Sequence, residues 1–212
     1  MNSTLRRTGA LATVSLVLSL GLAACGNDDS SDTKASSDPT SDASNSSMTN
    51  AGADTFGAGC AAIPTSGKGS FDGMSTDPVA TAASNNPLLK TLVAAVTKAG
   101  LGDTLNSAEG ITVFAPTDDA FAKIPAATLQ QVLADKPTLT KILTHHVIAG
   151  RLSPDQLAGQ HKTLAGDTVT VTGSGDAYKV DTTGGPASVI CGNIPTSNAT
   201  VYVVDTVLMP AA

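Results

Sequence analysis

The chain has 212 residues, three cysteines, no tryptophan and a formal net charge of -6 at pH 7. This length provides for one ordinary domain with short appendages and excludes a multidomain protein. Because no basic stripe runs along the sequence, we do not expect nucleic acid or anionic lipid headgroups as partners.

The N-terminal segment, residues 1–24, has the pattern of an export signal. Arg6 and Arg7 precede an apolar run from Ala10 to Ala24, which is the order of a basic region followed by a hydrophobic region. With about 15 apolar residues, the run is shorter than the roughly 20 that a membrane-spanning helix needs. We therefore interpret residues 1–24 as a signal peptide that is removed on maturation.

The residues from Leu22 to Cys25 resemble the lipobox of bacterial lipoproteins. In a lipobox the cysteine becomes the first mature residue and its sulfur, a strong nucleophile as the thiolate, carries a diacylglycerol. The resemblance implies a protein anchored in the cell membrane through Cys25 and facing the exterior or the envelope, because two acyl chains anchor stably. The alternative is ordinary cleavage that leaves Cys25 free or disulfide-bonded.

From Gly26 to about Ala58 the chain consists mainly of Ser, Asp, Asn, Thr, Ala and Gly, with Phe56 as its only aromatic residue. A segment of this composition buries too little apolar surface to offset the entropy lost on ordering. We interpret residues 25–58 as the lipidated cysteine and a disordered acidic tether, which spans roughly 30 Å as a flexible coil. The folded domain is then expected at residues 59–212.

Cys60 and Cys191 are the two cysteines that remain once Cys25 is acylated. Because an exported protein meets an oxidising compartment, we predict that these two form a disulfide. A metal site built from these two cysteines is a weaker alternative, since neither belongs to a C-x-x-C pair.

Helix starts are marked by prolines, three of which follow a residue that can cap a helix. These positions are Asp77-Pro78, Asn86-Pro87, Pro125, Pro137 and Ser153-Pro154. After Asn86, apolar residues recur at helical spacing as far as Gly100, which supplies the stop. Gln156 is placed to complete a capping box with Ser153.

Strand patterns dominate the second half of the chain. Residues Thr168 to Thr172 alternate strictly, and a turn at Gly173 to Asp176 leads to a returning strand around Tyr178. Residues Val201 to Leu208 are apolar enough for a central strand, and Ile111 to Ala115 form a shorter run. Because helices come first and a hairpin-rich sheet follows, the order favours an α+β fold.

Three stretches in this order resemble the fasciclin (FAS1) domain. They are TVFAPTDDAFAKIP at Thr112–Pro125, ILTHHVIAGRLS at Ile142–Ser153 and ATVYVVDTVLMP at Ala199–Pro210. The segment Ala83–Leu105 also matches the opening helices of the family. The resemblance implies a single domain of two packed β-sheets in a wedge, flanked by several short helices. The paired cysteines fit a mycobacterial subgroup of secreted immunogenic proteins and their lipid-anchored relatives.

The family is displayed outside the cell, often with adhesion or matrix contact as its role. The resemblance therefore implies a non-enzymatic, lipid-anchored module that binds an unknown protein or glycan at the cell surface. The alternative is a carrier or sensor at the envelope, with a hydrophobic pocket between helices and sheet for a lipid or a haem-like molecule.

The family often has Tyr-His where this chain has His145-His146. Because this region is tied to adhesion in animal relatives, the change argues against carrying over that binding, and both histidines stay candidate binding residues. We expect His146 to be a buried imidazole satisfied by a hydrogen bond and His145 to be partly exposed. No metal site is predicted, because adjacent side chains point to opposite faces of a strand and diverge by about 100° on a helix.

Arg151 and Asp205 complete the candidate binding residues. Arg151 is the only arginine beyond the signal peptide, and a simple ion pair is its alternative role. Asp205 lies within an apolar run, where a structural hydrogen bond is the alternative. Asp118 and Asp119 could form a carboxylate pair, but we expect them in the first turn of a helix capped by Thr117, where the dipole favours negative charge.

Signatures of an enzyme are missing from the sequence. No G-x-S-x-G nucleophile motif occurs, and GAGC at Gly57–Cys60 lacks the preceding strand of a dinucleotide loop. We therefore predict no catalytic residue and no cofactor. Asn198-Ala199-Thr200 is a glycosylation sequon, to which we assign no function.

Overall fold

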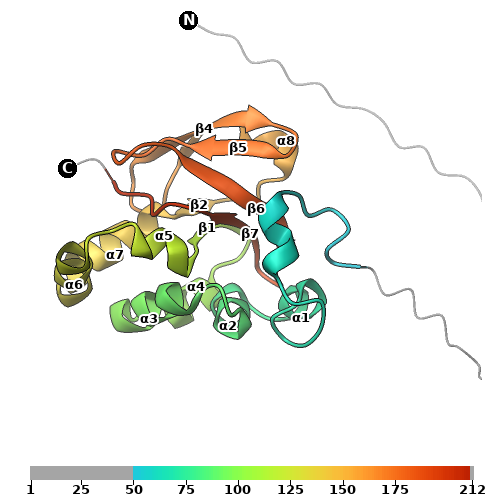
Figure 1. The fold of residues 1–212 in the computed structure, drawn as a ribbon, viewed down its shortest axis with the longest axis horizontal. Coiled ribbons are helices and arrows are strands. Elements are labelled where there is room, and N and C mark those ends of the chain that lie inside the picture. Colours follow the sequence, from blue (N-terminus) through green and yellow to red (C-terminus); the bar gives the residue numbers. More distant parts are fainter. Residues whose placement is uncertain (1–49, 211–212) are drawn as a thin grey trace, which may run out of the picture. The chain divides into compact units, whose positions relative to one another are not determined.

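The structure of this chain is a computed structural model that describes residues 50–210 (Figure 1). The expected signal peptide, Cys25 and most of the expected tether lie outside these residues. The described part combines helices with one mixed sheet, which confirms the α+β class. None of the helices within residues 50–210 is long and apolar enough to cross a membrane.

Within residues 50–210, seven strands form one continuous sheet in the order β2-β1-β7-β6-β5-β4-β3. They are β1 (Ile111–Pro116), β2 (Val147–Ala149), β3 (Gly159–Lys162), β4 (Thr168–Ser174), β5 (Ala177–Val180), β6 (Ala187–Pro195) and β7 (Ala199–Val204). The β1–β7 pair is parallel and the other pairs are antiparallel. A bridge between Ile148 and Thr163 brings the two ends of the sheet together. The two packed sheets implied by the resemblance are thus two halves of one sheet that nearly closes into a barrel.

Aromatic side chains fill the space between these two halves. Phe114 and Tyr202 are fully buried, with ring centroids 6.0 Å apart, and Phe56 lies 5.4 Å from Tyr178. The hydroxyl of Tyr202 donates to the carbonyl of Leu152 at 2.9 Å, so its polar end is satisfied inside the core. This inner core holds the halves of the sheet together.

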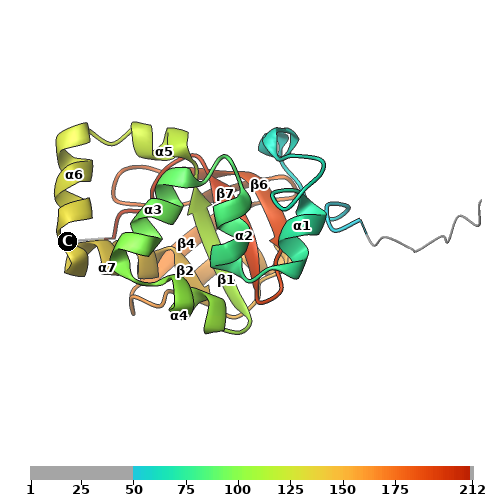
Figure 2. The ribbon, with the colours of Figure 1, turned by 90° about the horizontal axis from the view of Figure 1, so that it is seen from below.

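Eight α-helices and one 3-10 helix are present in residues 50–210. They are η1 (Ala58–Ala62), α1 (Phe71–Thr76), α2 (Val79–Asn85), α3 (Lys90–Ala99), α4 (Gly102–Ser107), α5 (Asp118–Ala122), α6 (Ala126–Ala134), α7 (Lys136–His145) and α8 (Pro154–Leu157). Figure 2 shows α2, α3 and α4 side by side in front of β1 and β7. A second hydrophobic core lies between these helices and the outer face of the sheet.

Two helices begin later than the capping patterns predict, because their caps come from distant residues. Helix α3 starts at Lys90, not after Asn86, whose Oδ1 accepts from the N–H of Leu88 at 3.0 Å. The Oδ1 of Asp118 accepts from the N–H of Thr91 at 2.7 Å and so satisfies the first turn of α3. At α2, the N–H of Val79 donates to Asn198 at 2.8 Å. The capping box at Ser153 is present as predicted.

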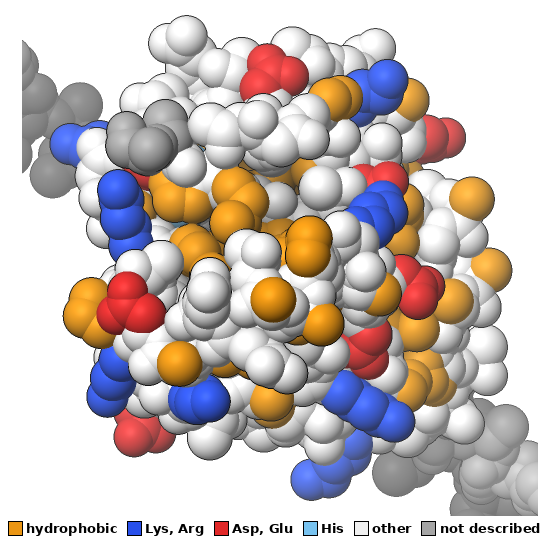
Figure 3. Space-filling model, turned by 60° about the vertical axis from the view of Figure 1, so that its left-hand side comes forward, with side chains coloured by type: hydrophobic (Ala, Val, Ile, Leu, Met, Phe, Trp, Pro, Cys, Tyr) orange, Lys and Arg blue, Asp and Glu red, His pale blue; other side chains and the backbone are white. Residues whose placement is uncertain are grey.

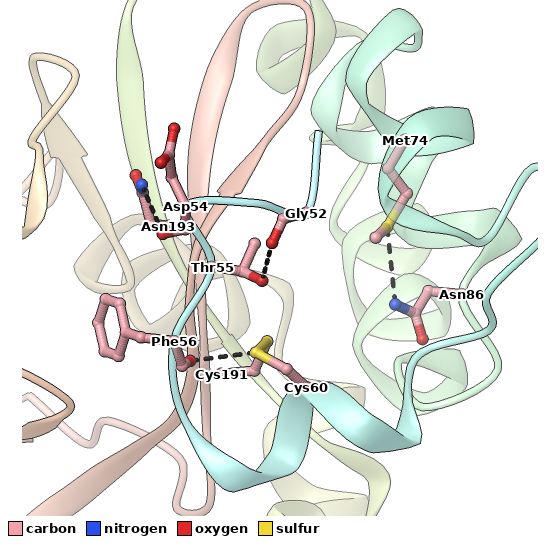
Figure 4. The surroundings of a disulfide bond; sticks show 9 residues. All are labelled: Gly52, Asp54, Thr55, Phe56, Cys60, Met74, Asn86, Cys191 and Asn193. Carbon is pink, nitrogen blue, oxygen red and sulfur yellow. Dashed lines mark hydrogen bonds between the residues drawn. A yellow bond between two sulfur atoms is a disulfide. The ribbon is translucent and has the colours of Figure 1, made fainter. Parts of the chain in front are cut away.

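A disulfide joins Cys60 to Cys191, 131 positions later, which confirms the predicted pairing (Figure 4). Just before it, the N–H of Phe56 donates to the carbonyl of Gly192 at 3.2 Å and the N–H of Gly192 donates back at 2.8 Å. A Cβ at Gly192 would lie 2.2 Å from Cζ of Phe56, so this close approach requires glycine. Asn193 also donates to the carbonyl of Asp54 at 3.0 Å. Ordered contacts therefore begin earlier than the expected boundary at residue 59.

Candidate functional site

His146 follows helix α7 and is buried, as expected, with 2% of its surface exposed. Its Nε2 accepts from the N–H of Leu208 at 2.9 Å, and its Nδ1 lies 2.8 Å from the carbonyl of Ile142. A backbone amide can only donate, so Nε2 carries no proton and Nδ1 donates to Ile142. Burial is the largest cause that lowers the pKa of His146 to about 4. The ring is a neutral structural link in which both nitrogens are occupied.

His145 is also buried, with 4% of its surface exposed, so the expectation of partial exposure is wrong. The turn between β3 and β4 covers it, and its Nδ1 pairs with Oδ2 of Asp167 at 2.8 Å. Partial burial would raise the pKa of Asp167, but hydrogen bonds from Thr163 and His145 outweigh burial and hold this pKa below its ordinary value. The rings of His145 and His146 are perpendicular, with centroids 6.4 Å apart.

Arg151 is exposed beyond the end of β2, and within residues 50–210 it does not form the ion pair that was its alternative role. Its guanidinium donates to the carbonyl of Thr196 at 3.3 Å and to that of Ser197 at 3.1 Å. No carboxylate within residues 50–210 lies at ion-pair distance from it. The side chain fastens the turn between β6 and β7 to the end of β2.

Asp205 lies just after β7, because this strand ends at Val204 and not at Leu208 as predicted. Its Oδ1 accepts from the N–H of Ser188 at 2.8 Å, which is the structural hydrogen bond that was one of its two expected roles, and its Oδ2 pairs with Lys123 at 3.3 Å. Partial burial would raise the pKa of Asp205, but these hydrogen bonds and Lys123 hold it below its ordinary value.

The four candidate binding residues do not form one site. The register of β1 places Ile111 beside Ala199, near Arg151, and Pro116 beside Val204, near Asp205. Arg151 and Asp205 therefore lie at opposite ends of β1. Within residues 50–210 no group of three or more His, Cys, Asp or Glu side chains is arranged to hold a metal ion.

Asp118 and Asp119 lie in the first turn of α5, as predicted, and the Oγ1 of Thr117 accepts from the N–H of Ala120 at 3.2 Å. Since Asp118 also caps α3, it already serves the fold and is not part of a free carboxylate pair.

The sequon residue Asn198 is likewise committed to the fold. Its Nδ2 donates to the carbonyls of Leu105 and Ala108, each at 2.7 Å, and its Oδ1 accepts from the N–H of Val79. A glycan attached to Nδ2 would break these contacts. The side chain connects the turn before β7 to α2 and α4.

A cavity of about 240 Å³ lies between α2, α3, α4 and the sheet. Its deepest lining residues are Val96, Val113, Phe114, Leu143, His146 and Val147. The sequence predicted a pocket between helices and sheet only in general terms, because the packing of three short helices has no local sequence signature. This cavity is the strongest candidate binding site in the described part of the chain.

The surface of the molecule has a mixed character. On the face shown in Figure 3, lysine and arginine side chains alternate with acidic ones, and hydrophobic side chains are exposed among them near the middle. Neither sign of charge forms a continuous area on this face. Strong electrostatic steering of a highly charged partner is therefore not expected there.

Comparison with known proteins identifies a family and several relatives to which this chain is similar. A family profile described as "Fasciclin domain" matches residues 87–210. The immunogenic protein MPB70 of Mycobacterium bovis is 51% identical over 171 residues, which cover 76% of this chain and 86% of the relative. The cell surface glycolipoprotein MPB83 of the same species is 47% identical over 187 residues, which cover 84% and 83%.

Among solved structures, this chain is similar to a FAS1 domain pair from the insect cell adhesion molecule Fasciclin I. The identity is 24% and the TM-score is 0.49. The match covers 57% of this chain and 45% of the insect protein chain.

Proposed function

Because the chain belongs to the fasciclin domain family, we propose that it is a cell-surface lipoprotein whose domain binds a protein or glycan partner without catalysis. The family match over residues 87–210 confirms the resemblance drawn from the three sequence stretches. The observation that carries the proposal is the 47% identity, over 84% of this chain, to a relative named as a cell surface glycolipoprotein. This cell-surface relative also supports an exported location.

The proposed anchor is a diacylglyceryl group on Cys25, after removal of residues 1–24. The lipobox pattern from Leu22 to Cys25 supports it, and the acidic stretch that follows would hold the domain away from the bilayer. The division into signal peptide, tether and fasciclin domain is part of the same proposal. The contacts of Phe56 support a domain that begins before residue 59.

The hydrogen bonds of the candidate polar side chains support the proposal that the domain is not catalytic. Both nitrogens of His146 are hydrogen-bonded, Asp118 caps a helix and Asp205 holds a strand end. A general acid or base needs a group within hydrogen-bond reach of a substrate proton. These groups instead reach backbone atoms of their own domain.

The test compares the wild-type chain with Cys25→Ser in its own cells. We expect the wild type in the membrane fraction with acyl groups on Cys25 by mass spectrometry, and the variant in the soluble exported fraction. Envelope components should be captured by both forms, since capture depends on the domain. An unlipidated wild type, or a domain that captures nothing and whose deletion leaves attachment unchanged, would overturn the proposal.

The second candidate function is a small-ligand carrier or sensor at the envelope. It is favoured by the 240 Å³ cavity, whose deep lining is apolar. Native mass spectrometry of protein purified from its own cells discriminates between the two, because a retained small molecule supports the carrier. A bare protein mass together with a captured envelope partner supports the interaction module.

A further inference from the structure

The cavity between α2, α3 and α4 has an apolar floor. Val96, Val113 and Phe114 lie there and are buried, and Leu143 and Val147 close the side toward α7 and β2. Such a surface offers dispersion contacts and no directional hydrogen bonds. An occupant of the floor must itself be apolar, since a buried polar group without a partner is costly.

His146 is the polar residue of this floor, but its nitrogens are not available to an occupant. Nδ1 donates to the carbonyl of Ile142 and Nε2 accepts from the N–H of Leu208. A haem iron needs the lone pair of a ring nitrogen, and here that lone pair is already bonded to a backbone amide. The ring therefore contributes carbon surface to the floor.

The rim of the cavity is polar, in contrast to its floor. Thr81, Ser84 and Thr97 are exposed there, and Asn106 is partly exposed. Asp103 is the only charged side chain in the cavity lining. The amide of Asn106 is already bonded to Ala80 and Thr81. The hydroxyls of Ser84 and Thr97 donate to carbonyls of their own helices and keep only their acceptor lone pairs. With hydroxyl acceptors and one carboxylate at its mouth, the cavity favours an uncharged head group that donates a hydrogen bond over an anionic one.

The size of the cavity limits the occupant. An apolar cavity of roughly 150 Å³ holds a molecule as large as benzene, and the volume here is about 240 Å³. Pockets for large cofactors and drug-sized ligands occupy roughly 300 to 1,000 Å³. A single slender chain fits these limits and a wide planar macrocycle does not.

We propose that the cavity between α2, α3 and α4 binds the unbranched hydrocarbon chain of an amphiphile with an uncharged polar head. The inference rests on the second candidate function and names its ligand class. The chain lies on the floor formed by Val96, Val113 and Phe114, and the head lies among Thr81, Ser84 and Thr97. The bound molecule is a free amphiphile, not the acyl group of Cys25.

The first experiment uses the full chain with Cys25→Ser, which carries no acyl group. It is titrated with 1-hexanol, 1-octanol, 1-decanol and 1-dodecanol, followed by calorimetry and by amide chemical shifts. We expect Kd to fall about fourfold for each added methylene, the equivalent of about 0.8 kcal/mol, until the cavity is full. Amides of Val93 and Leu105, which line the cavity, should shift most.

Two matched variants test the location. Ala83 lines the cavity from α2, whereas Ala94 on α3 is exposed and is not part of the lining. Ala83→Phe should weaken 1-decanol binding at least tenfold, and Ala94→Phe should leave it within twofold. Because Ala83→Phe could disturb folding, Leu105→Ala provides a second route: a larger cavity should move the end of the methylene trend to a longer alcohol.

Two further measurements test the preferred head group and whether the occupant is a free amphiphile or the acyl group of Cys25. Decanoate at neutral pH should bind several-fold more weakly than 1-decanol, and Asp103→Asn should narrow that difference. Lipidated wild type should bind 1-decanol as the Cys25→Ser chain does; if it does not, the occupant is the acyl group of Cys25.

A Kd without chain-length dependence, or equal effects of Ala83→Phe and Ala94→Phe, would overturn the proposed binding site. If the alcohols do not bind, the proposed binding of envelope partners by the domain is not affected.

Discussion

The Nε2 of His146 accepts a hydrogen bond of 2.9 Å from the backbone N–H of Leu208, 62 positions later in the chain. Leu208 is fully buried, and its amide has left the sheet because β7 ends at Val204. The imidazole thus takes over the role that a neighbouring strand would have had. It ties the end of α7 to the segment that follows the central strand β7.

Replacing this ring should destabilise the domain. His146→Leu leaves the N–H of Leu208 and the carbonyl of Ile142 without partners in a buried place, which we expect to cost about 2 to 4 kcal/mol. Urea unfolding at neutral pH measures this loss. The control is His161→Leu, since His161 is half-buried and bonds only the carbonyl of Leu157; equal losses in the two variants would contradict the role of His146.

The same residue should make stability depend on pH in a defined window. In the folded state the pKa of His146 is lowered from 6.5 to about 4, so the unfolded chain binds the proton first and stability falls as pH decreases from about 6.5 to about 4. The difference corresponds to about 3 kcal/mol in the free energy of unfolding. Urea unfolding between about pH 7 and pH 4.5 measures it.

His146→Leu should flatten the curve in that window. Asp167 and Asp205 affect stability at lower pH. Their pKa values are lowered in the folded state, so the ionised carboxylates stabilise the fold at a pH above the ordinary carboxyl pKa, and this stabilisation is lost as the carboxylates become protonated. A His146→Leu chain with an unchanged slope between pH 6.5 and 4.5 would show that another group titrates.

Breaking the disulfide should lower stability strongly. Cys60 and Cys191 close a loop across 131 positions, and the chain-entropy estimate for so long a loop is about 4 to 5 kcal/mol, with about 2 to 5 kcal/mol typical of small exported domains. The double variant Cys60→Ala, Cys191→Ala should show this loss in thermal or urea unfolding. Cys25→Ser should unfold like the wild type, and loss of stability in that control would contradict the assignment.

Two neighbouring variants test whether Asp118 stabilises the domain by capping α3. Asp118→Ala removes the acceptor of the Thr91 N–H, and the expected loss is about 1 kcal/mol, the usual value of a helix cap. Asp119→Ala, one residue away and exposed, should change stability by less than about 0.5 kcal/mol. Similar losses in both variants would mean that the negative charge near the α5 dipole matters, and not the cap.

Replacing the side-chain amide of Asn198 should destabilise the domain. Asn198→Asp exchanges the Nδ2 donor for a carboxylate oxygen that faces the carbonyls of Leu105 and Ala108. We expect a loss of about 2 to 4 kcal/mol in the free energy of unfolding, since partly buried carboxylate and carbonyl oxygens would meet without a donor between them. Thr200→Ser keeps the sequon and the Asn198 amide, and should stay close to wild type; mass spectrometry should find Asn198 unmodified.

The elements that could be predicted from the sequence are those specified by neighbouring residues. The capping box at Ser153 and the Thr117 cap of α5 are present as the pattern indicates. Likewise the alternation from Thr168 gives β4, and the turn into β5 lies within the predicted segment but is shorter, since Gly173 and Ser174 still pair with β5 and only Gly175 and Asp176 form the turn. In each case the residues that decide the structure lie within a few positions of one another.

What could not be predicted depends on partners far along the chain. Helix α3 begins late because its cap is Asp118, and β7 ends early because Asp205 turns to the amide of Ser188. His145 is buried because Asp167 covers it from a turn 22 positions away. The cavity has the same origin, since residues of β1, α7 and β2 complete the lining that α2, α3 and α4 begin.

The sheet can be completed only when β7 is available. Among the strands within residues 50–210 it comes last, yet it lies between β1 and β6 and is the parallel neighbour of β1. A nascent chain that lacks it has the two parts of its sheet separated, and contacts of long sequence separation form slowly. We therefore expect a chain that remains threadable through a translocation channel during synthesis and completes its sheet only after release on the far side.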